Sequence, residues 1–229
     1  PDLIITYGMG NPETDVNRKI SEAGIPIAIS IDHLETSPLA RANWIKFVAA
    51  FFEKGELADS IVNEIEKKYT DLKAMANPLS SAKSAPKPKV LTEIKLNDTW
   101  FVPGGKSFMA ELLNDAGADY IWRDNEKTGS LTLSYEEVYL KALEADYWLN
   151  LSNWNSLKDC NAQDERNINF KAFKNKNLYN NNAILNKEGG NAYWETGLIS
   201  PDEILADLIK IFHPDLLPEH KLKYYKKLN

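Results

Sequence analysis

The first thirty residues carry a strand–helix–strand pattern, which restricts the fold more than any other feature of the chain. The β-branched run at 2–6 is typical of a strand buried on both faces. Pro12 and Glu13 fit the first turn of a helix, where proline is tolerated and an acid complements the helix dipole. A second apolar run at 25–29 follows Gly24. Two strands joined by a helix form the unit of a parallel sheet, so we predict an α/β fold.

A long predicted helix separates two regions that both alternate strands and helices. Apolar residues recur at helical spacing over 56–76, with charged residues opposite, and at ~1.5 Å per residue this helix is about 30 Å long. The polar segment 77–86, rich in proline and serine, follows it and marks a boundary. We therefore predict the remainder of an N-terminal α/β lobe at 1–55, a linking helix and polar break at 56–86, and a C-terminal α/β lobe at 87–229.

The second half of the chain continues the alternation of strands and helices. A helix is predicted from Ser37 to about Phe52 in the first half and from about 107 to 116 in the second. Ser134 and Ser200 are positioned to cap two further helices, the last of which has Pro201 in its first turn. Apolar runs predict strands at 89–94, 99–102, 119–122, 147–151 and 177–180. This alternation predicts mostly parallel sheets covered on both faces.

Composition argues against several classes of partner. The net charge is −6 and no lysine/arginine block occurs, which argues against nucleic acid. No apolar stretch approaches the ~20 residues that a membrane-spanning helix needs. The three histidines, His33, His213 and His220, are too few for a metal cage made by the protein. We predict no bound metal and no cofactor, and we expect His213 and His220 to finish helices by bonding carbonyls.

Sequence motifs for covalent or phosphate chemistry are weak or missing. There is no Gly-x-Ser-x-Gly nucleophile motif, and Cys160 has no histidine near it in sequence, which favours a buried thiol. Gly104-Gly105-Lys106-Ser107 resembles the end of a phosphate-binding loop, but Trp100 stands where the motif requires glycine. A glycine turn between a strand and a helix is the better interpretation, and we predict that the protein is not an enzyme.

Aromatic residues near predicted strand ends are the strongest sign of a binding site. The loops after the carboxyl ends of parallel strands line the ligand crevice of such sheets. Broad rings there suit a large, partly apolar ligand, for which packing in the core is the alternative explanation. Four aromatic residues occupy such positions, namely Tyr7, Trp100, Phe101 and Trp154, and a fifth, Trp194, precedes the last predicted helix. Nearby asparagines offer neutral hydrogen bonds: Asn153, Asn155, Asn180, Asn181 and Asn182.

The order of these elements resembles the class III periplasmic binding proteins, the substrate-binding subunits of ABC importers for iron–siderophore complexes, haem and cobalamin. The resemblance covers the whole chain and is most specific in three stretches: PDLIITYG, DTWFVPGGKSFMAELLNDAGADYIW and NAYWETGLISPDEILADLIKIFHPDLLPEHKLKYYKKL. It implies two α/β lobes with mostly parallel sheets joined by a long linking helix. In that family the strand that matches PDLI comes after a first half-lobe, so we expect residues before Pro1 and an incomplete N-terminal lobe here.

The resemblance also implies roles for individual residues. The aromatic residue after the first strand, Tyr7, is expected in the cleft. Each lobe of the family carries a glutamate that meets an arginine of the membrane permease, and the matching positions are Glu13 and Glu195. A surface acid that favours a helix N-terminus is the alternative for both. The expected ligand-binding set is Tyr7, Trp100, Phe101, Trp154, Asn181 and Trp194.

Together these observations predict a periplasmic solute receptor, with a lipid anchor upstream of Pro1 as one further expectation. It is expected to capture a siderophore complex, haem or a corrinoid between its lobes and to pass it to an inner-membrane ABC permease. We expect a monomer when the chain is complete. The alternative is an enzyme on the same two-lobed scaffold, in which Asp98 and Glu195 face each other across the cleft as acid and base.

Overall fold

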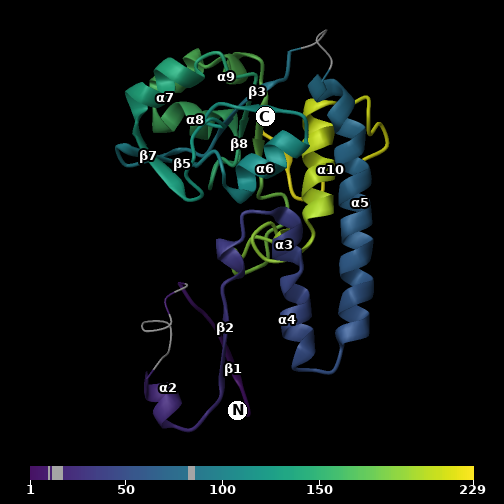
Figure 1. The fold of residues 1–229 in the computed structure, drawn as a ribbon. Helices are drawn as coiled ribbons and strands as arrows, with labels where there is room; N and C mark the ends of the chain where they lie inside the picture. The colour runs from purple at the N-terminus through teal and green to yellow at the C-terminus, as the bar shows by residue number, and fades with distance from the viewer. Residues whose placement is uncertain (10, 12–17, 82–85) are drawn as a thin grey trace.

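The computed structural model describes residues 1–9, 11, 18–81 and 86–229. A larger α/β region, built by the second half of the chain, lies at one end of the molecule, and a small pair of strands lies at the other (Figure 1). The long helix α5 (Gly55–Ser81) runs along one side (Figure 1). The predicted domain limits stay a prediction, although the alternating α/β architecture is confirmed.

Two parallel strands form the N-terminal region. β1 (Ile4–Tyr7) pairs with β2 (Ile27–Ser30), as predicted, and the short helix α2 (Arg18–Glu22) precedes β2. The prediction that β1 is buried on both faces is wrong for the described residues. Ile5 and Tyr7 are both exposed, and their sheet has only two described strands.

The single helix predicted from Ser37 to Phe52 is instead two helices. After a 3₁₀ turn, η1 (Asp32–Leu34), the chain forms α3 (Pro38–Ala42) and α4 (Trp44–Ala50). The break falls at Asn43, whose side-chain Nδ2 donates to the Leu39 carbonyl at 3.0 Å. Asparagine bonds local backbone groups in this way and thereby competes with the regular helix.

The linking helix is longer than predicted, because α5 continues to Ser81 rather than ending at about residue 76. The predicted polar break is shorter accordingly, and its residues 82–85 lie outside the described part of the chain. α5 packs along α10 (Pro201–Phe212) (Figure 1), and most side chains of α10 are buried. Among the described residues, no helix combines the length and the apolar character needed to cross a membrane.

A buried carboxylate joins α5 to α6 (Phe108–Asp115). The Tyr69 hydroxyl of α5 donates a hydrogen bond to Asp115 Oδ2 at 2.8 Å, and Lys73 Nζ lies 2.9 Å from Asp115 Oδ1. The Asp115 side chain is almost fully buried, so its charge is tolerated only because both oxygens have partners. This contact ties the linking helix to the larger region.

The main sheet has five strands in the order β10-β9-β8-β3-β6. The four inner and edge strands β9, β8, β3 and β6 are parallel, whereas β10 runs antiparallel to β9. The mostly parallel sheet is therefore confirmed, and only the short C-terminal strand was not predicted. Its strands are β3 (Lys89–Thr92), β6 (Asp119–Tyr120), β8 (Tyr147–Leu149), β9 (Leu178–Asn180) and β10 (Lys226–Lys227).

One of the two serine caps predicted from the sequence forms. Ser134 forms a reciprocal capping box with Glu137, whereas the Ser200 side chain makes no capping hydrogen bond, although Pro201 occupies the first helical position. Ser134 caps α7 (Tyr135–Ala142). The other elements are α8 (Leu157–Gln163), α9 (Lys171–Lys174) and the 3₁₀ turns η2 (Glu165–Asn169) and η3 (Gly197–Ile199).

The strand predicted at 99–102 does not join the parallel sheet. It is β5 (Thr99–Pro103), the centre of a separate antiparallel sheet with β4 (Lys95–Leu96) and β7 (Ser130–Ser134). β7 was not predicted. An apolar run predicts a strand but not its partners, because pairing depends on segments far away in sequence.

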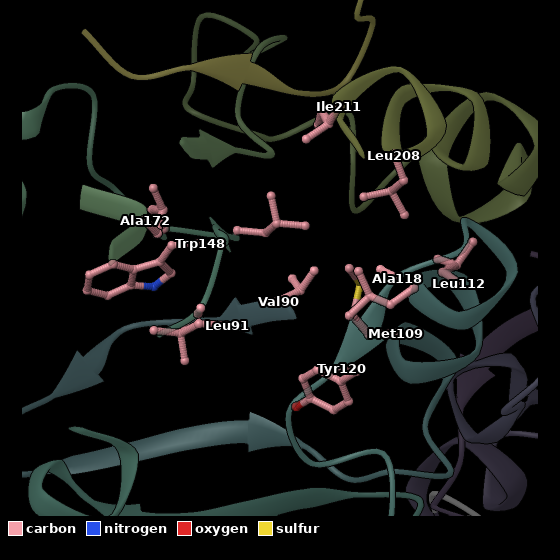
Figure 2. Packing of buried hydrophobic residues seen from close by; sticks show 14 of the residues in the cluster. Val90, Leu91, Met109, Leu112, Ala118, Tyr120, Trp148, Ala172, Leu208 and Ile211 are labelled. Atoms are coloured by element: carbon pink, nitrogen blue, oxygen red, sulfur yellow. The ribbon is translucent and has the colours of Figure 1, made fainter. Parts of the chain in front are cut away.

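The core lies between the parallel sheet and its helices. Val90 and Leu91 of β3 lie at its centre with Trp148 of β8, and Leu112 of α6 and Leu208 of α10 approach from the helical side (Figure 2). All five side chains are completely buried. Tight packing here fixes the ends of the central strands, from which the candidate site is built.

Candidate ligand-binding site

A pocket of about 420 Å³ opens at the carboxyl ends of three neighbouring parallel strands. A polar residue follows each strand at once: Glu93 after β3, Asn150 after β8 and Asn181 after β9. We call this cavity the asparagine pocket. Its lining residues are Glu93, Asn150, Ser152, Asn153, Asn155, Asn181, Asn182, Leu185, Gly189, Asn191 and Trp194.

Left-handed backbone conformations concentrate at the pocket. Glu93, Asn150 and Ser152 have φ angles of 65°, 60° and 50°. Such angles are uncommon outside glycine and are least unfavourable for asparagine, so they persist only where the surroundings hold them. Here Trp148 donates its Nε1 proton to the Glu93 carbonyl at 2.8 Å, and Glu93 N donates to the Leu149 carbonyl at 2.9 Å. The strand ends therefore turn sharply and place polar residues around the cavity.

Glu93 supplies the single carboxyl group of the lining. Burial raises its pKa to about 7, opposed by a hydrogen bond from Asn150 Nδ2 to Glu93 Oε1 at 3.2 Å. Its surroundings include the hydroxyls of Tyr120, Tyr193 and Tyr225, whose pKa values are raised mainly by burial and further by this carboxyl. No ion pair to Glu93 forms within the described part of the chain. The group can therefore change its charge near neutral pH.

Asn180 holds the floor of the pocket together. Its Oδ1 accepts hydrogen bonds from the backbone nitrogens of Leu151 at 2.7 Å and Asn181 at 2.9 Å. Its Nδ2 donates to the carbonyls of Ser152 at 2.9 Å and Trp154 at 2.8 Å. The side chain is fully buried, so all of its capacity is used in fixing the loop after β8 against the end of β9. Asn180 is thus a structural residue and does not line the pocket.

Two neighbouring asparagines have hydrogen-bonding capacity that the protein does not use. Asn181 and Asn182 are 3% and 5% exposed, and both line the pocket. Asn181 Nδ2 and Asn182 Oδ1 have no partner, while Asn182 Nδ2 makes a long contact of 3.4 Å with Asn155 Oδ1. Buried polar atoms are nearly always hydrogen-bonded, and leaving one unpaired costs ~1–3 kcal/mol. Unpaired atoms on a cavity wall are positioned to bind a ligand.

Two residues of the predicted ligand-binding set line this pocket. They are Asn181 on its wall and Trp194, which is 56% exposed. The Trp194 and Tyr193 rings form an edge-to-face pair, with the ring centroids 4.8 Å apart. Sequence reasoning missed Glu93, Asn150 and Ser152, although each lies at or just past the end of a predicted strand.

Trp100 and Trp154 belong to the core instead. Trp100 is 1% exposed, stacks on Trp148 at 5.6 Å and donates its Nε1 proton to the Thr92 carbonyl. Trp154 is 4% exposed and meets Trp148 edge-on. Trp100 does not follow a parallel strand, because β5 is antiparallel, and Trp154 turns inward beneath the loop that Asn180 holds. Direct ligand contact by these rings stays a prediction, against which their burial argues.

The other predicted aromatic residues lie away from the asparagine pocket. Phe101 is exposed on β5, opposite Thr132 of β7, because alternate residues of a strand face opposite sides. Tyr7 is exposed at the end of β1, edge-on to His33 at 6.2 Å. Tyr7 also lines a second, mostly apolar cavity of about 560 Å³ beside β1 and α4.

The predicted acids are not brought to the pocket in the described residues. Glu13 lies outside the part of the chain that the structure describes. Glu195 is exposed in the turn before η3, and Asp98 is exposed in the turn between β4 and β5. Neither Glu195 nor Asp98 lines the asparagine pocket. Docking by Glu13 and Glu195 stays a prediction.

Metal and thiol chemistry find little support in the described residues. No three side chains of histidine, cysteine, aspartate or glutamate come together there in a way that could hold a metal ion. Cys160 is buried, as predicted, and burial raises the pKa of its thiol to about 12. His220 Nε2 lies 2.7 Å from Asp207 Oδ1, so it pairs with a carboxylate rather than with the predicted carbonyl.

Solved structures with a similar fold include periplasmic binding proteins. A periplasmic haem-binding protein from Pseudomonas aeruginosa matches with a TM-score of 0.69 and 17% identity, over 100% of this chain and 77% of that one. The fold is that of periplasmic solute-binding proteins. A haem-binding protein from Roseiflexus matches with a TM-score of 0.68 and 20% identity, over 94% of this chain and 77% of that one. A solute-binding protein from Veillonella parvula matches with a TM-score of 0.67 and 21% identity, over 97% of this chain and 62% of that one.

Sequence comparison finds relatives without an assigned function. An uncharacterized lipoprotein of Methanocaldococcus jannaschii is 28% identical over 232 residues, which cover 100% of this chain and 52% of the relative. A second uncharacterized lipoprotein of that organism is 24% identical over 237 residues, covering 100% and 56%. The chain thus spans about half the length of these relatives. No family model matches the sequence.

Proposed function

We propose that this chain is the solute-binding part of an ABC importer outside the cytoplasmic membrane, in the periplasm. In this proposal it captures a bulky iron chelate, either a siderophore complex or haem, or a corrinoid, and delivers it to the membrane permease. The observation that carries the proposal is the asparagine pocket, formed after three neighbouring parallel strands in a solute-binding fold. The naming of two relatives as lipoproteins supports the location.

The chemistry of the pocket supports binding rather than catalysis. Asparagine and serine side chains orient a ligand by hydrogen bonds but do not transfer protons near neutral pH. Glu93 is the one titrating group on the described lining, whereas acid–base catalysis on a bound substrate usually uses two groups with separated pKa values. The rival pair, Asp98 and Glu195, lies off the lining.

The proposal is tested by titrating the protein with ferrichrome, ferrioxamine B, haemin and cyanocobalamin while following tryptophan fluorescence. Trp194 stands at the pocket, so a bound chromophore is expected to quench its emission. At least one of the four is expected to bind with a Kd of about 1 μM or tighter, a free energy of about −8 kcal/mol. Mass spectrometry of the released ligand then separates the two classes. Unchanged ligand supports the receptor, and converted ligand supports the enzyme.

A further inference from the structure

Building on the proposed importer function, we infer that the asparagine pocket selects a neutral or cationic cargo rich in hydroxyl or amide groups and rejects polyanions. The inference concerns the ligand class of the same site. It rests on the charge of the lining, on the unpaired carboxamide atoms and on the hydrogen bonds already made at the N-terminus of α8.

The described lining offers no positive charge to an anionic ligand. None of its residues is a lysine or an arginine, and its one ionisable group, Glu93, is an acid. Lys226 contacts a lining residue, because its Nζ donates to Asn155 Oδ1 at 2.9 Å in an exposed hydrogen bond. Polyanion recognition in proteins relies on clusters of arginine and lysine that pair with each charge. A single exposed lysine already bonded to an amide does not provide this.

The helix terminus beside the pocket is already occupied by an acid of the chain. α8 begins after Ser156, and Asp159 Oδ2 accepts hydrogen bonds from the backbone nitrogens of Asn155 at 2.8 Å and Ser156 at 2.9 Å. Amides of the first turn, which attract anions at a helix start, are also engaged: Leu157 N donates to the Asn229 carbonyl at 3.2 Å and Asp159 N to Ser156 Oγ at 3.4 Å. Backbone donors bound by the protein's own carboxylate therefore favour ligands without negative charge.

The unpaired atoms on the wall specify the complementary groups. Asn181 presents a donor and Asn182 an acceptor, and both are nine-tenths buried or more. A hydroxyl or an amide can accept from the first and donate to the second, whereas a carboxylate can only accept. Glu93 adds an acceptor for a cationic or donating group at the end of β3. The pocket is thus matched to ligands that both donate and accept hydrogen bonds.

The test compares three iron chelates of different charge at pH 8: cationic ferrioxamine B, neutral ferrichrome and trianionic ferric enterobactin. Ferrioxamine B or ferrichrome is expected to bind about 100-fold more tightly than ferric enterobactin. Glu93→Gln is expected to lower the preference for ferrioxamine B over ferrichrome about tenfold, and Asn181→Ala to weaken both about tenfold. Glu188→Gln is the matched control, because it removes the same charge from an exposed site near the pocket and is expected to change nothing.

The outcomes separate this inference from the proposed function. Ferric enterobactin binding as tightly as the other two chelates would overturn the inference and leave the importer proposal standing. An unchanged ferrioxamine B to ferrichrome ratio in Glu93→Gln would also overturn it. If none of the three chelates binds at ~1 mM, the inference is overturned, and the importer proposal fails as well if neither haemin nor cyanocobalamin binds.

Discussion

Replacing Glu93 by glutamine is expected to stabilise the protein at alkaline pH but not at acidic pH. In the folded state the pKa of Glu93 is raised to about 7 from the ordinary value of 4.5, because burial disfavours the charged form. Below pH 4.5 both folded and unfolded chains hold the proton. Between about 4.5 and 7 the unfolded chain releases it first, so the free energy of unfolding falls as the pH rises.

The size of the effect follows from the difference between these two pKa values. Each pKa unit is worth about 1.36 kcal/mol, so the carboxyl lowers stability by at most about 3 kcal/mol above pH 7. The value is an upper limit because part of the Glu93 side chain meets the water of the pocket. Glutamine keeps an oxygen that can accept the hydrogen bond from Asn150 Nδ2, so the substitution removes the charge and little else.

Urea unfolding of both proteins at pH 4.5, 6, 7 and 8 measures this difference. The stability gained by Glu93→Gln is expected to rise from near zero at pH 4.5 to a plateau above pH 7. For an m value of about 3 kcal/mol/M the plateau corresponds to a midpoint shift of up to ~1 M. Other carboxyls titrate in both proteins and cancel in the comparison. A constant difference across this pH range, or the same trend in Glu188→Gln, would refute the argument.

Three further predictions concern the pocket, the core and docking. Asn180→Ala is expected to destabilise the fold by ~2–4 kcal/mol, because it leaves several buried backbone groups unpaired, whereas Asn181→Ala should lower ligand affinity and leave the urea midpoint unchanged. Trp100→Ala is expected to cost about 3–5 kcal/mol of stability, measured in the same way, and a normal midpoint with weakened ligand binding would show that this ring meets the ligand after all. Glu13→Ala and Glu195→Ala should reduce transport without changing ligand affinity in solution, and an equal loss of affinity would place these acids in the cleft.

The sequence predicts strands and helices well because their signals are local. The strand at 89–94 and the helix after Ser134 are identified by a short apolar run and by a capping serine, and both are present. Strand pairing is not local. The run at 99–102 has the composition of a buried strand in either kind of sheet, so its place in an antiparallel sheet, and the burial of Trp100 there, could not be predicted.

The sequence predicted site residues only where a side chain suited to ligand binding occurs at a position expected to line the crevice. Asn181 was identified because residues after parallel strands line ligand crevices, and Trp194 because its broad ring lies at a loop position before the last helix. Asn180, one residue earlier, has the same side chain as Asn181 but a structural role, and the difference depends on which way the chain turns after β9. Glu93 was missed because glutamate gives no sequence sign of a left-handed backbone, and Asn150 was missed although asparagine tolerates one.

The four hydrogen bonds of Asn180 also have an evolutionary consequence. They hold the pocket's loops in place through backbone atoms, so the side chains that line the pocket contribute little to the stability of the fold. Mutations at Asn153, Asn181 or Asn182 can therefore accumulate without loss of the native state. A gene copy with this architecture is free to drift toward a different cargo while its scaffold stays intact. The same separation makes these three positions the natural choice for a directed-evolution library that seeks new ligand specificity.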